Sequence, residues 1–225
     1  MKSKLLYIIL FSLFALIYCD NTLEEHPINK KLIYSIKKGN IKNVKNLLSK
    51  GASPDGYISS FGKIKPALIT AVRTANYKIV EILLKNGANP DFKGNADTSP
   101  LIETCFADDN LNKHFKILKL LIKFGADVNM QVYGDSALAS AVMKGNVKVV
   151  KYLVEHGANV NTVDLFGNTI LINLCNLKNE QYEIAKYLIK KGADIRIKNH
   201  RNLTALDYAK KRKFKRLISL LQKNL

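Results

Sequence analysis

A short phrase that begins with Gly-Ala recurs five times along the chain, each time after an apolar run. Successive glycines are 36, 38, 32 and 35 residues apart. A period in this range is typical of stacked repeat proteins, whose units bury a continuous core only by packing on their neighbours. The period therefore predicts a linear stack of similar units. The phrases are GASPD at Gly51, GANPD at Gly87, GADVN at Gly125, GANVN at Gly157 and GADIR at Gly192.

Two helices are predicted in each unit. Apolar residues stand three, four and seven positions before each glycine, which is the spacing of one helix face. The glycine then ends the helix in a left-handed conformation. A shorter helix comes earlier in each unit, and Ser or Thr at its start is expected to act as an N-cap. The position four before the glycine is predicted to form one interior row of Leu47, Leu83, Leu121, Leu153 and Leu188. The shorter helices open at Pro66, Ser99, Ser136, Thr169 and Thr204.

These residues resemble the ankyrin repeat, in which a Thr-Pro-Leu-His-x-Ala turn, two antiparallel helices and Gly-Ala-Asp make units of about 33 residues. The resemblance implies an all-α solenoid of about six helix-turn-helix units joined by β-turn fingers, with capping units at both ends. We expect apolar packing to replace the consensus histidine, where Ile69, Ile102, Ala139, Ile172 and Asp207 stand. The units are predicted at residues 28–60, 61–94, 95–130, 131–163, 164–198 and 199–225.

Residues 1–19 have the layout of an export signal, in which Lys2 and Lys4 precede an apolar run that ends at Tyr18. The run is shorter than the ~20 residues of a membrane-spanning helix, and a buried first helix is the alternative. Leu16-Ile17-Tyr18-Cys19 resembles a bacterial lipobox except at Tyr18, so lipidation of Cys19 and ordinary cleavage both stay open. Residues 20–27 read as a tether before the repeat domain at 28–225. We expect an exported bacterial protein, in the periplasm or anchored in the cell envelope.

The sequence lacks the usual signatures of catalysis, and we predict a chain that is not an enzyme and takes no cofactor or metal. Its four histidines have no Cys or carboxylate at metal-ligand spacing. Phosphate-binding glycine loops and nucleophile elbows are missing. A catalytic pair of Cys105 and His114 is conceivable, but Cys105 and Cys175 stand at small core positions. Two units would separate these thiols by ~20 Å, which is too far for a disulfide.

The resemblance places a partner on the concave face, which in this family is built from the finger tips and the exposed side of each first helix. Phe106, Met143 and Leu177 are the expected apolar anchors. The large apolar residues of the fingers are predicted to form an exposed ridge, whereas Val132 and Val163 are expected to pack between fingers. The first-helix positions are Lys37, Lys38, Arg73, Phe106, Met143, Lys144, Leu177, Lys211 and Arg212, and the ridge residues are Tyr57, Phe61, Tyr133, Leu165 and Phe166.

The charge balance bears on the kind of partner. The formal net charge is +18 and falls to about +16 without the predicted signal. Cations along the groove would steer an acidic partner, although an AT-rich genome composition explains many lysines equally well. We predict a monomeric, non-catalytic scaffold that binds a protein partner. A binder of acidic glycans or lipid head groups, and a secreted host-directed effector, are the alternatives. Membrane contact is expected only through a lipid on Cys19, and nucleic acid is not an expected partner of an exported protein.

Overall fold

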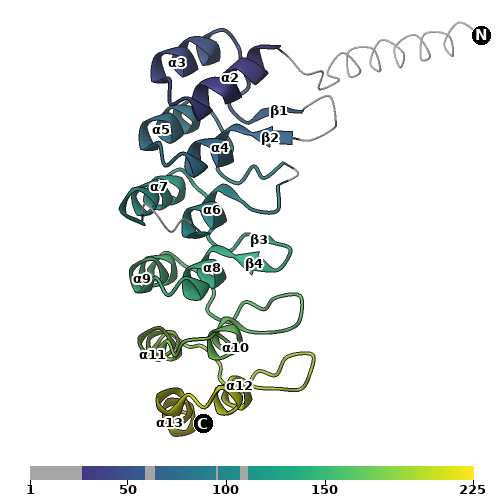
Figure 1. The fold of residues 1–225 in the computed structure, drawn as a ribbon, viewed down its shortest axis with the longest axis vertical. Helices are drawn as coiled ribbons and strands as arrows, with labels where there is room; N and C mark the ends of the chain where they lie inside the picture. The colour runs from purple at the N-terminus through teal and green to yellow at the C-terminus, as the bar shows by residue number, and fades with distance from the viewer. Residues whose placement is uncertain (1–26, 59–63, 95, 107–110) are drawn as a thin grey trace, which may run out of the picture.

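Helix pairs stack in one direction to form an elongated slab (Figure 1). The computed structural model describes residues 27–58, 64–94, 96–106 and 111–225. The helices fall into two layers, and consecutive helices of one pair lie in different layers (Figure 1). The predicted all-α repeat stack is thus confirmed. The first helices are α2 (Pro27–Lys37), α4 (Ala67–Arg73), α6 (Pro100–Phe106), α8 (Ala137–Met143), α10 (Ile170–Cys175) and α12 (Ala205–Arg212). The second helices are α3 (Ile41–Ser49), α5 (Tyr77–Lys85), α7 (Leu111–Lys123), α9 (Val147–Glu155), α11 (Tyr182–Lys190) and α13 (Lys215–Lys223).

Fingers project from one side of the stack, beside the first helices (Figure 1). Two of them contain antiparallel hairpins. In one, β1 (Gly56–Ile58) pairs with β2 (Ile64–Pro66), so that Tyr57 lies opposite Lys65. In the other, β3 (Gln131–Val132) pairs with β4 (Asp135–Ser136). The next finger closes with a single bridge between Val163 and Thr169.

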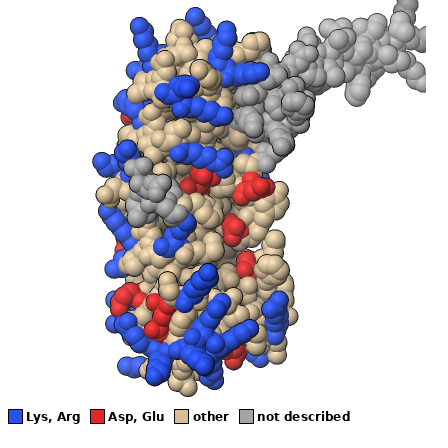
Figure 2. All heavy atoms as spheres, in the orientation of Figure 1, with Lys and Arg blue, Asp and Glu red and all other residues tan. Residues whose placement is uncertain are grey.

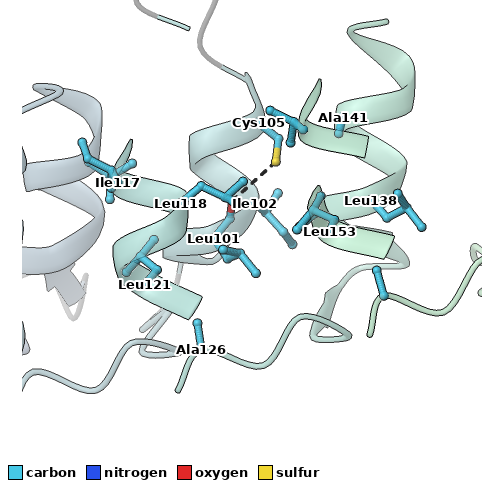
Figure 3. Close-up of a cluster of buried hydrophobic side chains, with 14 of the residues drawn as sticks. Leu101, Ile102, Cys105, Ile117, Leu118, Leu121, Ala126, Leu138, Ala141 and Leu153 are labelled. Atoms are coloured by element: carbon cyan, nitrogen blue, oxygen red, sulfur yellow. Dashed lines mark hydrogen bonds between the residues drawn. The ribbon is translucent and has the colours of Figure 1, made fainter. Parts of the chain in front are cut away.

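The predicted leucine row lies inside the slab. Leu47 is 6% exposed, and Leu83, Leu121, Leu153 and Leu188 are completely buried. The column seven before the glycine is also fully buried. The column three before it is only partly buried in the third, fourth and fifth units, at Ile122, Val154 and Ile189. Figure 3 shows leucines of α6, α7, α8 and α9 in one cluster of buried side chains. Burying each of these side chains stabilises the stack by roughly 2 kcal/mol, so neighbouring units depend on one another.

Helix ends follow the predicted local chemistry. The hydroxyls of Ser99, Ser136 and Thr169 accept backbone N–H groups three residues on. Thr204 forms a capping box with Asp207, so this replacement of the consensus histidine makes hydrogen bonds rather than apolar packing. Ile69, Ile102 and Ile172 do pack in the core. The five glycines of the repeat have φ of 89, 87, 87, 93 and 90°, the left-handed conformation expected at the end of each second helix.

One finger residue differs from the sequence-based expectation, and several predicted residues lie outside the part of the chain that the structure describes. Val132 is 1% exposed and packs as expected, but Val163, which bridges to Thr169, is 44% exposed. Cys19, Phe61 and the predicted signal lie outside the described residues, and so does the side chain of Tyr57. Of the helices that the structure describes, none is both long and apolar enough to cross a membrane.

Candidate partner-binding surface

A ladder of Asn and Asp side chains fixes the spacing of the fingers. Each side chain accepts a hydrogen bond from the backbone N–H two residues after a repeat glycine. From Asp55 onward, that glycine belongs to the next unit. Because every rung joins two neighbouring segments, the fingers form one connected surface. The rungs are Asn29 to Ser53 (2.7 Å), Asp55 to Asn89 (2.7 Å), Asp91 to Asp127 (3.0 Å), Asn129 to Asn159 (2.8 Å) and Asn161 to Asp194 (2.8 Å).

Three large apolar side chains stand in solvent at the tips of two neighbouring fingers. Tyr133 is 71% exposed, Leu165 is 65% exposed and Phe166 is 69% exposed. Tyr133 and Gly134 both have positive φ, as in the type I′ turns that close two-residue hairpins. We call Tyr133, Leu165 and Phe166 the ridge. These are the predicted ridge residues whose side chains the structure describes.

Hydrogen bonds hold the ridge in place from below. The Asp164 carboxylate accepts the backbone N–H groups of Phe166 (2.8 Å) and Asn168 (2.9 Å). It also accepts the side-chain amides of Asn168 and Asn173, each at 3.0 Å. Partial burial opposes the charge on Asp164, but these hydrogen bonds from Asn173, Asn168 and Phe166 together lower its pKa. The turn that presents Leu165 and Phe166 is therefore built around an ionised carboxylate.

Neighbouring fingers support the ridge from both sides. The Gln131 side chain donates to the carbonyl of Val163 at 2.9 Å, and the N–H of His200 donates to the carbonyl of Phe166 at 3.1 Å. Gly134 lies so close to the next finger that a Cβ there would be 2.9 Å from the Leu165 nitrogen. Exposed apolar side chains on a rigid support lose little conformational freedom when they bind.

The first helices add three apolar side chains beside the fingers, Phe106, Met143 and Leu177, which we call the apolar floor. Phe106 is 38% exposed and Met143 is 42% exposed, whereas Leu177 is half-buried. The predicted cation Arg73 is paired, since its guanidinium donates to both oxygens of Glu103 at 3.0 and 3.1 Å. Alignment with the ankyrin consensus pointed to the last residues of each first helix. It did not identify Glu103, which lies three residues before Phe106 on α6.

Two exposed cations of this face lie at each of its ends, and two more, Arg73 and Lys144, lie between the ends. Lys37 and Lys38 are exposed at the N-terminal end. Lys211 and Arg212 are exposed at the other end, and Arg212 donates to the carbonyl of Asn176 at 2.7 Å. Lys144 caps α8 between the two ends. Within α4, α6, α8 and α10, the charged residues are Arg73 and its partner Glu103.

Acidic side chains lie near the middle of the face. Figure 2 shows a group of them about midway along the stack and dense basic side chains near its C-terminal end. Asp135 is exposed next to the ridge. Partial burial and the nearby charge of Asp164 raise the pKa of Asp135. The centre of the concave face therefore combines apolar and acidic side chains with two exposed cations, Lys144 and the paired Arg73, and it carries less positive charge than the ends.

The two thiols and the buried histidine lie in the packed interior. Cys105 and Cys175 are free and buried, and burial raises the pKa of each to about 12. Cys105 donates weakly to the carbonyl of Leu101 (Figure 3). His114 Nε2 lies 3.1 Å from the carbonyl oxygen of Val72. Across the described residues, no group of three or more His, Cys, Asp or Glu is arranged to hold a metal ion. Thiols with such a pKa are protonated at neutral pH and are poor nucleophiles.

Comparison with protein-family models shows which family this stack belongs to. A model of ankyrin repeats in three copies matches residues 68–164, and a model of ankyrin repeats in many copies matches residues 153–209. The chain belongs to the ankyrin-repeat family. Both matched ranges contain repeat glycines and residues of the leucine row.

Solved ankyrin structures overlay most of the chain. An ankyrin repeat domain from Acinetobacter baumannii AYE has a TM-score of 0.75 at 28% identity and covers 86% of this chain and 96% of its own. A chain in the structure of the predatory endopeptidase Bd0816 from Bdellovibrio bacteriovorus in complex with immunity protein Bd3460 has a TM-score of 0.70 at 27% identity. That overlay covers 86% of this chain and 97% of the other.

Curated relatives share only a part of their length with this ankyrin stack. Alpha-latrocrustotoxin-Lt1a from Latrodectus tredecimguttatus is 43% identical over 94 residues, which are 41% of this chain and 6% of the toxin. Alpha-latroinsectotoxin-Lt1a from the same spider is 33% identical over 123 residues, or 53% of this chain and 8% of the toxin. The chain thus spans less than a tenth of these relatives, and the match concerns the repeat alone.

Proposed function

We propose that this protein is a non-catalytic scaffold that binds a protein partner through the ridge and the apolar floor. The observation that carries the proposal is the exposure of Tyr133, Leu165 and Phe166 on a rigid hydrogen-bonded support. Ankyrin repeats generally mediate protein–protein interaction, and one structural neighbour is a chain from the structure of an endopeptidase in complex with an immunity protein. Large apolar side chains at the centre of a surface are the usual anchors of such interfaces.

The charges around the ridge suggest the character of the partner. An apolar segment of the partner would cover the ridge. A strongly acidic segment is disfavoured there, because the acidic side chains near the centre of the face would repel it. Acidic flanks of the same partner would meet the exposed cations at Lys37 and Arg212. Electrostatic attraction at the rim would then act mainly on the rate of association, and apolar burial at the centre on the lifetime of the complex.

Paired variants test the role of the ridge. Leu165→Ser with Phe166→Ser removes two ridge side chains that make little contact with the core. Tyr34→Ser with Leu225→Ser is the control, because Tyr34 and Leu225 are 63% and 70% exposed at the ends of the stack. Cross-linking and mass spectrometry on native envelopes should recover the same protein with the wild type and the control, and lose it with the ridge variant. Equal recovery from all three would refute the proposal.

We also propose that the protein acts outside the cytoplasm, with residues 1–19 as its export signal. The support is the sequence itself, where Lys2 and Lys4 precede the apolar run. A lipid anchor would give palmitate labelling of the wild type and none of Cys19→Ala. Ordinary cleavage would give an unlabelled mature chain in the soluble envelope fraction. Retention of the uncleaved chain in the cytoplasm would contradict export in either form.

A further inference from the structure

A second surface, separate from the ridge, lies on the layer of second helices. It is a groove of about 990 Å³ between α5 and α7, on the opposite side of the stack from the fingers (Figure 1). Among the described residues that line it, the carboxylate is Glu81, which accepts from Lys78 and Lys85 at 2.8 Å each. The groove therefore carries a large positive excess. Its cations are Lys78, Lys85, Lys113, Lys116, Lys119 and Lys123.

The lysines of α7 are arranged along the groove. Lys116, Lys119 and Lys123 follow one another at intervals of three and four residues, so they lie on one helix face at about 5.4 Å per turn. Lys119 rests over the rings of Phe115 and Tyr152, at 4.9 and 5.2 Å from their centroids. In the part of the chain that the structure describes, no carboxylate is ion-paired to these lysines. A row of lysines without carboxylate partners along a groove suits a linear polymer that carries repeated anionic groups.

Other groups at the mouth of the groove narrow the classes of anionic ligand that it could bind. Tyr77 lines it and is 41% exposed. Thr74 and Asn76 add a hydroxyl and an amide. Lysine is a flexible point charge that contacts a carboxylate or sulfate without demanding a fixed planar geometry. Acidic sugars offer all the matching features, namely anionic groups, hydroxyls and an apolar ring face that can pack on tyrosine.

The shape of the groove bears on the kind of anionic partner. Helices packed with their axes ~10 Å apart are in contact through their side chains, so the groove is a furrow along the surface between α5 and α7. A single polymer chain can lie along this furrow and contact Tyr77 and the lysines together, whereas a lipid bilayer or a nucleic-acid duplex would meet mainly the crests of the two helices. We propose that the α5–α7 groove binds a single chain of an acidic polysaccharide, with the α7 lysines on its anionic groups and Tyr77 against a sugar ring.

A second groove supplies a control within the same molecule. It lies between α11 and α13, has a volume of about 850 Å³ and is lined by Lys186, Lys190 and Lys223 together with two further cations. Its aromatic ring is covered, because the Arg216 guanidinium stacks over Tyr182 at 4.0 Å from the ring centroid. Among the described residues, no cation lies over Tyr77. The two grooves thus have similar charge but differ in the ring that they offer.

Binding of labelled oligogalacturonate of defined length to the full chain tests the proposal. K113Q/K116Q/K123Q removes three charges from the proposed site, and K186Q/K190Q/K223Q removes three from the control groove. We expect the first variant to weaken binding at least about tenfold and the second less than about twofold. Tyr77→Ala should weaken it about fivefold without changing the salt dependence. Circular dichroism should show that all three variants keep the wild-type fold, since these side chains are exposed.

Several outcomes would overturn the proposal. Equal losses in the two lysine variants would mean that the oligosaccharide responds to total charge. Tighter binding of phosphatidylglycerol vesicles or of single-stranded DNA, lost in the K113Q/K116Q/K123Q variant, would assign the groove to a different partner. The ridge variant Leu165→Ser with Phe166→Ser should bind oligogalacturonate like the wild type. The groove and the ridge proposals can therefore fail separately.

Discussion

One rung of the finger ladder is built differently from its neighbour, and an exchange of the two residues tests how the ladder works. At the Asn129 rung, the side chain accepts the N–H of Asn159 and also donates to the carbonyl of Gly157 at 3.0 Å. At the Asp91 rung, both carboxylate oxygens share the N–H of Asp127 at 3.0 and 3.1 Å. A carboxylate cannot donate, so Asp91 makes one interaction fewer. Asp91→Asn should supply the missing donor to the carbonyl of Gly125.

The expected gain is about 1 kcal/mol in the free energy of unfolding at neutral pH. A net hydrogen bond contributes ~0.5–1.5 kcal/mol. Burial and the neighbouring charge of Asp127 raise the pKa of Asp91, which means that the folded state disfavours its ionised form. That penalty is complete at neutral pH and disappears as the pH falls through the raised pKa to below the ordinary value near 3.9. The advantage of Asp91→Asn should therefore be largest at neutral pH and shrink in acid.

Urea unfolding followed by far-UV circular dichroism, at neutral and at acidic pH, measures the effect. Asn129→Asp is the matched reverse variant and should destabilise by about 1 kcal/mol, because it removes the donor to Gly157. For a chain of this size, each change corresponds to roughly 2–4 °C in Tm. The reasoning fails if Asp91→Asn leaves the neutral-pH stability unchanged or lowers it, or if the two variants shift stability in the same direction.

Three further predictions concern the core, a finger and the thiols. Leu121→Ala should cost about 2–5 kcal/mol of unfolding free energy in the same urea assay, whereas Leu165→Ala should change it by less than about 0.5 kcal/mol; similar costs would contradict the assigned burial. Gly134→Ala should destabilise by about 1–3 kcal/mol, because it combines positive φ with the approach to the Leu165 nitrogen, and a neutral effect would mean that the fingers are not in contact. Cys105 and Cys175, each with a pKa of about 12, should react with Ellman's reagent at mildly alkaline pH only after unfolding, and rapid labelling of the native protein would show that they are accessible.

The repeat made most of the fold predictable from sequence. A core column must be apolar in every unit, so Leu83, Leu121 and Leu153 stand out by alignment of the chain with itself. Local signals such as the caps at Ser136 and Thr169 need only neighbouring residues. The finger ladder was also readable in principle, since Asp or Asn follows most of the repeat glycines by four positions. Its hydrogen bonds cross between units, however, and single-unit templates do not describe such contacts.

The candidate surface was less predictable, because exposed positions have no repeated constraint. Arg73 was expected as a groove cation, but its pairing with Glu103 depends on the distance between two helices that are 30 residues apart in sequence. Exposure of Val163 depends on how one finger turns. The α5–α7 groove is not predictable from one helix, because its lysines come from two separate helices of the second layer.

The placement of charge argues for two surfaces with different roles. A lysine-rich composition would fill equivalent exposed positions of the stack alike. At the exposed end of the first helices, however, the outer units carry pairs of cations that include Lys37 and Arg212, whereas two central units carry Phe106 and Met143, the latter beside the single cation Lys144. In the second layer, lysines occur in every helix from α3 to α13. Lysines throughout the second layer are what such a composition predicts, whereas the apolar residues at the centre of the other face are not. The two proposed partners, one on each face, would account for both.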